Sequence, residues 1–209
     1  MTPPRKRRRT TEEFLASLQS DPELQARRDE FEARLAAERV RLAAAEAPVV
    51  RDLNAAGLRV ESVWDLVNTN DSYTVALPIL LDHLQRDYPD KVREGIARAM
   101  AVRESKFAWH TLIRLFRAQF DANPNGVKGA LAVALSEAAD DEVMSDLIEL
   151  FKEPRHGESR IFFVTTLKRS RLANARAALA AGRQDPQLVR EIVRVLDRPK
   201  RRSRRKEMT

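Results

Sequence analysis

A helical pattern that recurs every 30 to 35 residues constrains the fold of this chain more than any other feature of its sequence. Four segments begin at Val92, Val127, Ser159 and Val189, and they read VREGIARAM, VKGALAVAL, SRIFFVTTL and VREIVRVLD. Each segment has a basic second residue followed by apolar side chains at helical spacing. The sequence therefore predicts one type of amphipathic helix used four times.

Each of these helices follows another segment with helical spacing. The preceding segments begin near Pro78, His110, Ser145 and Ala173, and the last of them is an Ala-rich run. Residues that favour turns separate the two members of each pair: Tyr88-Pro89-Asp90, Asn123-Pro124-Asn125-Gly126, Pro154-Arg155-His156-Gly157 and Gln184-Asp185-Pro186. Two-helix units at this period are typical of α-solenoids, in which each unit packs on its neighbours.

The pattern resembles the HEAT-like (armadillo-type) family of helical repeats. In that family the second helix often opens with Asp and then Val-Arg, as Asp90-Lys91-Val92-Arg93 does, and Asp185 precedes Val189-Arg190 in a similar way. The resemblance implies an all-α fold: a short right-handed solenoid of about four hairpins over residues 72–197. The third unit departs from the family pattern, because Ser159 replaces Val and its turn has no Asp. Such a resemblance indicates architecture rather than function.

Residues 11–71 are expected to form N-terminal helices, one of them long. Ser20-Asp21-Pro22 is a typical helix start, and the pattern predicts an amphipathic helix over residues 22–46. Its apolar stripe is thin and consists of Leu24, Phe31, Leu35 and Leu42. A thin stripe predicts packing on one side only, against the repeats or against another helix.

Pro48 is expected to interrupt the long helix. Val49 to Leu53 then predict a short helix that Gly57 ends in a left-handed conformation, and Ser62 to Val67 predict another. The chain has only 6 glycines, and Ala, Leu, Arg and Glu, which favour helices, dominate its composition. The composition therefore agrees with an all-α fold.

The positive charge of the chain is concentrated in two short basic runs. The net charge is +7, yet outside residues 5–9 and 198–206 only 26 basic residues remain against 31 acidic ones. We expect a disordered basic arm over residues 1–10 and a disordered basic tail over residues 198–209. The candidate nucleic-acid-binding residues are Arg5, Lys6, Arg7, Arg8, Arg9, Lys200, Arg201, Arg202, Arg204, Arg205 and Lys206.

The basic second residue of each repeated helix forms a further candidate site. These residues are Arg93, Lys128, Arg160 and Arg190, and they are the candidate partner-binding face. A stripe of this kind could contact a partner or a phosphate group. The alternative is a structural ladder to acidic residues of the turns: Asp87, Asp90, Asp121 and Asp185.

The sequence contains no pattern typical of catalysis or of metal binding. It has no cysteine, its 3 histidines are widely spaced, and it has no glycine-rich phosphate-binding motif, so we expect no cofactor. Some HEAT-like proteins are DNA glycosylases, which need an aromatic side chain and a carboxylate together in the groove. Trp64-Asp65 and Trp109-His110 are the candidates, although packing is the simpler explanation for both tryptophans.

These observations favour a non-enzymatic scaffold or adaptor that binds another protein. The alternative is a protein that associates with DNA or RNA through its basic tails, and a glycosylase is a more distant third. No apolar run approaches the roughly 20 residues of a membrane span, so we expect a cytoplasmic protein, or a nuclear one if its source is eukaryotic. The sequence leaves the oligomeric state open.

Overall fold

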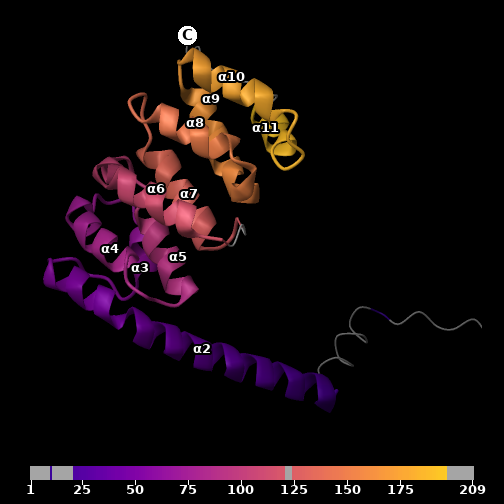
Figure 1. Ribbon diagram of the computed structural model, residues 1–209. Coiled ribbons are helices and arrows are strands. Elements are labelled where there is room, and N and C mark those ends of the chain that lie inside the picture. The colour runs from indigo at the N-terminus through magenta and orange to yellow at the C-terminus, as the bar shows by residue number, and fades with distance from the viewer. Residues whose placement is uncertain (1–9, 11–20, 121–123, 197–209) are drawn as a thin grey trace, which may run out of the picture. The chain divides into compact units, whose positions relative to one another are not determined.

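The computed structural model describes Thr10, residues 21–120 and residues 124–196, and every regular element in these residues is a helix (Figure 1). The all-α prediction is therefore confirmed. The chain divides into two compact units, Met1–Ala44 and Ala45–Thr209. Residues 1–9 of the predicted basic arm and all of the predicted basic tail (residues 198–209) lie outside the described residues, as do all their candidate nucleic-acid-binding side chains.

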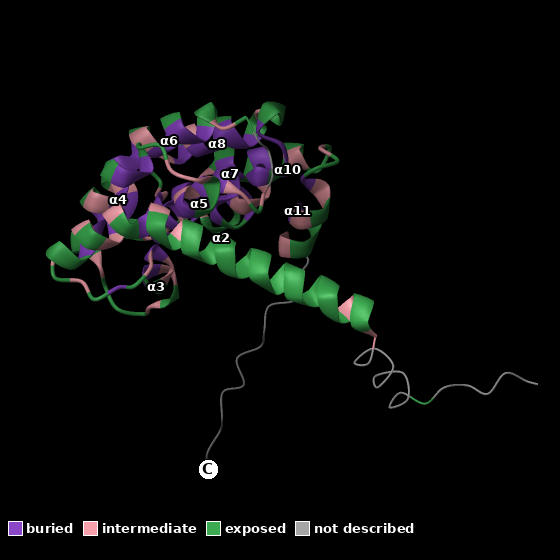
Figure 2. Ribbon diagram, turned by 90° about the horizontal axis from the view of Figure 1, so that it is seen from below, coloured by how far each residue is buried: buried purple, intermediate pink, exposed green. Residues whose placement is uncertain are grey.

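Helix α2 (Pro22–Ala55) begins where the sequence predicts, because Asp21 accepts a hydrogen bond from the Glu23 N–H at 3.0 Å. Its part in the first unit is covered by charged side chains that pair along the helix: Glu23 with Arg27, Arg28 with Glu32, and Glu38 with Arg41. Phe31 and Leu35 of the predicted stripe are exposed (Figure 2).

The prediction that Pro48 ends the long helix is wrong, since α2 continues to Ala55. Pro48 cannot donate a hydrogen bond to the Ala44 carbonyl, and the boundary between the two units falls at this point. Burial of Val49 and Leu53 in the second unit stabilises the helix beyond the proline. Gly57 then ends it with a φ of 91°, as predicted.

Helix α3 (Val63–Asn68) is held by carboxylates at its N-terminus. Ser62 and Asp65 form a capping box, and the buried Glu46 of α2 accepts hydrogen bonds from the Ser62 hydroxyl at 3.0 Å and the Val63 N–H at 2.6 Å. These contacts join the last part of α2 to α3. Because α3 packs on α5, residues 45–71 belong to the same unit as the repeats, whereas the sequence places the start of the repeats at residue 72.

The remaining helices follow in consecutive pairs (Figure 1). The bounds are η1 (Thr74–Ala76), α4 (Leu77–Leu84), α5 (Asp90–Ala99), η2 (Arg103–Ala108), α6 (Trp109–Ala118), α7 (Val127–Ala138), α8 (Met144–Lys152), η3 (Pro154–Phe162), α9 (Phe163–Arg169), α10 (Ala173–Gly182) and α11 (Val189–Leu196).

The second helices of the pairs pack against one another in chain order. Helix α5 contacts α3 and α7, α7 contacts η3 and α9, and α9 contacts α11. The first helices, α4, α6, α8 and α10, pack on this row from one side, and their apolar faces complete the core (Figure 2). Fully buried side chains such as Leu80, Ile96, Leu112, Leu131 and Leu147 form that core.

The third pair is irregular at the place where the sequence departs from the repeat. The predicted helix beginning at Ser159 is instead the 3₁₀ segment η3 followed by the short α9. Gly157, with a φ of 60°, interrupts η3, and the buried Ser159 lies just after it. Phe163 is buried in this pair, whereas Phe162 beside it is half-buried.

Candidate functional site

The predicted partner-binding face is not an exposed stripe, because the structure buries two of its four residues. Arg160 is 1% exposed, and its guanidinium is fully engaged. It pairs with Asp185 at 2.7 Å and donates to Gln187 Oε1 at 2.8 Å and to the carbonyl oxygens of Phe151 and Gly157 at 3.2 and 2.9 Å. Arg160 therefore joins the third pair of helices to the turn of the fourth.

Lys128 is also buried, with 3% of its surface exposed. Its ammonium group donates to the Gln119 carbonyl at 2.6 Å and lies 5.2 Å from the centre of the Phe116 ring. The prediction is thus corrected for Lys128 and Arg160. At these two positions the long cation faces the preceding or the following turn, where it satisfies carbonyl and carboxylate oxygens.

The other two members of the predicted face differ from each other. Arg93 is 19% exposed and lies 3.7 Å from Asp90 of its own helix, so this contact is not part of a ladder between neighbouring turns. Arg190 is exposed and has no ion pair with a described residue. Of the four, only Arg190 presents its charge freely to solvent.

A groove instead follows the row of second helices. It consists of three clefts with volumes of about 360, 280 and 380 Å³: the first lies beside α3, α5 and α7, the second beside α7, α9 and α11, and the third beside the ends of α7 and α9. Val133 lines both the first and the second cleft, whereas Glu137 and Thr166 line both the second and the third. The shared residues make the three clefts one continuous surface, which we call the interhelix groove.

The interhelix groove combines apolar side chains with charges of both signs. Val133 and Phe162 supply apolar surface at its centre. Glu191 pairs with Arg194 at 2.5 Å in the second cleft. The third cleft brings together Arg103, Glu137, Asp141 and Arg169. A surface with apolar anchors and mixed charges suits a peptide better than a phosphate backbone, which requires excess positive charge.

Three groove residues occupy equivalent positions of the sequence repeat, but not the position that was predicted to bind a partner. Arg98, Val133 and Thr165 lie six positions after Val92, Val127 and Ser159, and all three line the groove. Since they differ in chemistry, no shared residue type marks them in the sequence. Only the orientation of the helices reveals them.

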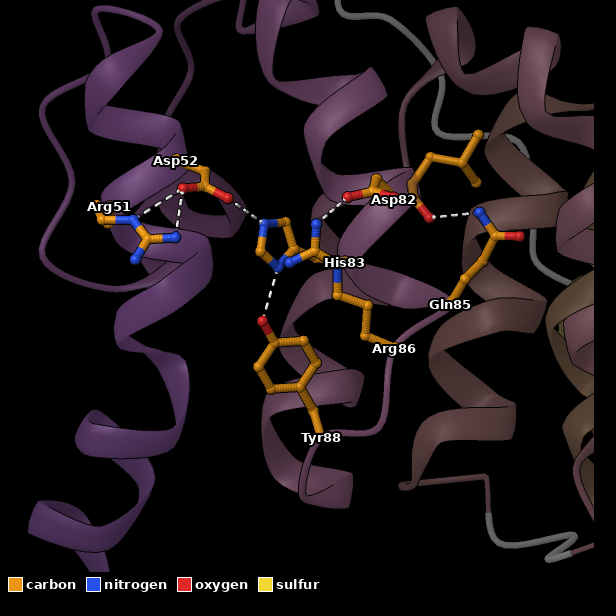
Figure 3. Close-up of polar contacts among 8 residues, drawn as sticks. Arg51, Asp52, Asp82, His83, Gln85, Arg86 and Tyr88 are labelled. Atoms are coloured by element: carbon orange, nitrogen blue, oxygen red, sulfur yellow. Dashed lines mark hydrogen bonds and ion pairs between the residues drawn. The ribbon is translucent and has the colours of Figure 1, made fainter.

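A second arrangement is a hydrogen-bonded chain of Asp52, His83 and Tyr88 (Figure 3). His83 is 1% exposed; its Nε2 lies 3.0 Å from Asp52 Oδ2 and its Nδ1 lies 2.7 Å from the Tyr88 hydroxyl. Because a carboxylate only accepts, a neutral His83 donates from Nε2 and accepts the Tyr88 hydrogen at Nδ1. Asp52 precedes His83 by 31 residues, and no local pattern predicts that contact.

The hydrogen-bonded arrangement of Asp52, His83 and Tyr88 has the connectivity of a catalytic relay but not its chemistry. Burial raises the pKa of Tyr88, so the phenol keeps its proton. Hydrogen bonds from Arg51 and then from His83 lower the pKa of Asp52. None of the three clefts includes these residues. The arrangement joins the end of α2 to the α4–α5 hairpin.

The tryptophans proposed for a glycosylase serve in packing and capping. Trp109 is buried and donates from Nε1 to Asp146 Oδ2 at 2.8 Å, away from the groove-lining residues. Trp64 packs against Gly95 and beneath the Lys91 ammonium, which lies 5.1 Å from its ring centre. Asp65 accepts the Ser62 N–H at 3.0 Å in the capping box.

Metal and membrane sites can be judged only for the described residues. Over residues 21–120 and 124–196, no group of His, Asp and Glu is arranged to hold a metal ion. None of the described helices combines the length and the apolar character that crossing a membrane needs.

Known proteins offer no guide to the groove. No protein family, curated protein or solved structure matches the chain. The function is therefore inferred from the residues of the chain itself.

Proposed function

We propose that the chain is a non-catalytic scaffold or adaptor, in which a short right-handed solenoid of about four HEAT-like hairpins binds a peptide segment of another protein in the interhelix groove. The observation that carries the proposal is the continuity of three clefts along the row of second helices. Helical-repeat proteins commonly use such an extended surface for partners.

The chemistry of the groove supports a protein partner. Phe162 and Val133 are half-buried, so each keeps some apolar surface for a partner side chain. Arg169 and Glu137, from neighbouring helices, can pair with partner charges of either sign. Apolar anchors surrounded by polar groups are the usual composition of a protein interface.

The absence of catalysis and the cytoplasmic location are parts of the same proposal. The side chains that come nearest to a catalytic relay hydrogen-bond to one another: Asp52, His83 and Tyr88. The pKa of Tyr88 is raised. A chain without cysteine is compatible with a reducing compartment.

The proposal is tested by site-specific photo-crosslinking of the full chain in its native host. A benzophenone side chain at position 133 or 162 should give a discrete cross-linked protein of the same mass. The control position is Arg114, which is exposed on α6 in the row of first helices. Cross-links of equal strength and identity from position 114, or none from the groove, would contradict the proposal.

A further inference from the structure

The last part of the described chain differs in charge from the rest of its unit. Residues 163–196 contain seven Lys and Arg against two acidic residues, whereas residues 45–162 contain fourteen against nineteen. The excess of positive charge therefore extends from the tail into folded helices.

All seven basic side chains of this segment are exposed. They are Lys168, Arg169, Arg171, Arg176, Arg183, Arg190 and Arg194, which we call the C-terminal basic surface. Within the described residues only Arg194 has an ion pair, with Glu191. The second acidic residue of the segment, Asp185, is paired with the buried Arg160. Six positive charges are thus left without a described carboxylate partner.

Helical register and two contacts place these charges together. Arg176 on α10 and Arg183, the residue just after its end, are seven residues apart, and Arg190 and Arg194 are four apart on α11, so each pair lies on one side of its helix. Lys168 donates to the Val195 carbonyl at the end of α11. Arg176 donates to the Arg171 carbonyl at 2.9 Å, before α10. The ends of α9 and α11 and the start of α10 therefore carry neighbouring cations.

Helix stability does not account for the whole set. Lys168 and Arg169 occupy the last turn of α9, where the helix dipole favours cations. Arg176 and Arg190 have no such position, because they lie in the first turns of α10 and α11, where the dipole favours anions instead. Their charge is unfavourable locally and is available to a ligand.

We propose that the C-terminal basic surface binds the phosphate backbone of duplex nucleic acid without reading its sequence. Six of its seven residues are Arg, whose planar fork matches phosphate oxygens. Residues 164–196 contain no aromatic residue, so there is no platform for stacking single-stranded bases. The ligand is therefore recognised through charge alone.

Other polyanions fit the surface less well. Helices that bind anionic membranes insert Trp, Phe or Leu, whereas Val193 is the only large hydrophobic residue exposed on this segment within the described residues. The sequence continues directly into the basic residues at 198–206. That run carries the same sign of charge, so it cannot neutralise the C-terminal basic surface.

The test compares two full-length triple variants for binding to a fluorescent 20-base-pair duplex at several KCl concentrations. Arg176→Gln, Arg183→Gln and Arg190→Gln together remove three charges from the surface. The control, Arg59→Gln, Arg86→Gln and Arg114→Gln, removes three exposed charges from residues 45–162. Circular dichroism verifies that both variants are folded.

Each phosphate contact contributes about 0.9 to the slope of log affinity against log salt. The surface variant should lower that slope by roughly 2 to 3 and reduce affinity on the order of 100-fold at 0.1 M KCl. The control variant should change affinity by less than about threefold. A full-length variant with Gln at the six basic residues of 200–206 should still bind and still depend on Arg176, Arg183 and Arg190.

Four results would overturn the proposal. The first is an equal loss of duplex affinity in the two triple variants. The second is a surface variant whose slope of log affinity against log salt is unchanged. The third is loss of all binding when only the tail is neutralised. The fourth is that the wild-type chain binds vesicles of anionic lipid, or an acidic peptide, more tightly than the duplex.

Discussion

The first three pairs of helices and the last pair are built on one helical pattern, yet they use charge in opposite ways. Between the earlier pairs, charged side chains are matched: Lys106 pairs with Asp140 and Glu142, and Arg117 lies 3.7 Å from both Glu149 and Glu153. In the last pair, Arg176, Arg183 and Arg190 have no such partner among the described residues.

The cores of the two regions differ in a parallel way. Leu, Ile, Met and aromatic side chains fill the earlier pairs, whereas α10 buries only Ala175, Ala178 and Leu179. Less buried apolar surface means less hydrophobic stabilisation, at about 25 cal/mol per Å². The last pair therefore depends more on the contacts of Arg160 with Asp185 and Gln187, which we call the polar joint. The end of the unit thus combines a thin core with charges that have no described partner.

The largest expected effect comes from breaking that joint. Arg160→Met should lower the free energy of unfolding by about 3 kcal/mol, because it leaves the Asp185 carboxylate without its partner in a partly buried site. Urea denaturation followed by circular dichroism measures the change.

Two controls make this prediction specific. Arg190→Met, at the equivalent but exposed position, should change the free energy of unfolding by less than about 0.5 kcal/mol. The double variant Arg160→Met with Asp185→Asn should recover part of the loss, since the unpaired charge is gone. Equal effects at Arg160 and Arg190 would mean that the joint is not a distinguishing feature of the last pair.

A smaller effect is expected at the opposite end of the same unit. Glu46→Gln should cost about 2 kcal/mol, because the buried carboxylate accepts hydrogen bonds from Ser62 and from the Val63 N–H at the start of α3. Glu61→Gln is the matched control, as Glu61 is exposed. Urea denaturation of both variants tests whether each end of the unit relies on one buried ionic group, and an equal cost for both would refute it.

The sequence predicts the helices of the repeats well and the orientation of their side chains poorly. Hydrophobic spacing and turn residues place α5, α7 and α11 correctly, and the departure at Ser159 coincides with the irregular η3. These features depend on local periodicity. The contact of Arg160 with Asp185 joins residues 25 positions apart, and its burial depends on the packing of two hairpins.

The errors have physical causes that a single sequence does not reveal. Proline ends many helices, but at Pro48 the burial of flanking apolar residues outweighs the loss of one hydrogen bond. A repeated cation such as Lys128 has the same letter pattern whether it faces solvent or a neighbouring carbonyl group. Summing charge over the whole body also hides the difference between residues 45–162 and residues 163–196.

The smallest predicted effect is on the pH dependence of stability. The two regions should lose stability in different pH ranges, because His156 titrates in one and Asp185 in the other. Burial, and then the charge of Lys128, lowers the pKa of His156 to about 4 from 6.5. The folded state keeps this imidazole neutral, so its contribution to stability is complete above pH 6.5 and is lost as pH falls towards 4. His156→Phe keeps the packing on Phe116. It should reduce the loss of unfolding free energy between pH 6.5 and pH 4 by roughly 1–2 kcal/mol.

The joint at Asp185 responds at lower pH. Burial raises the pKa of Asp185, but hydrogen bonds from the Gln187 N–H and from Arg160 outweigh it, so the pKa lies below 3.8. Its contribution is present above pH 3.8 and is lost as pH falls through the lower folded-state pKa. Unfolding measured between pH 7 and 3 for His156→Phe and Asp185→Asn should show two distinct ranges. A shared range would contradict the assignment.

Hydrogen exchange followed by mass spectrometry on the full chain tests most directly the claim that the last pair is a weakly packed, charge-bearing end of an otherwise well-packed unit. We predict the strongest amide protection in α5 and α7, weaker protection in α10 and α11, and a further loss confined to α10 and α11 in Arg160→Met. Equal protection of all four helices, or a loss in Arg160→Met that spreads evenly over residues 45–196, would contradict it.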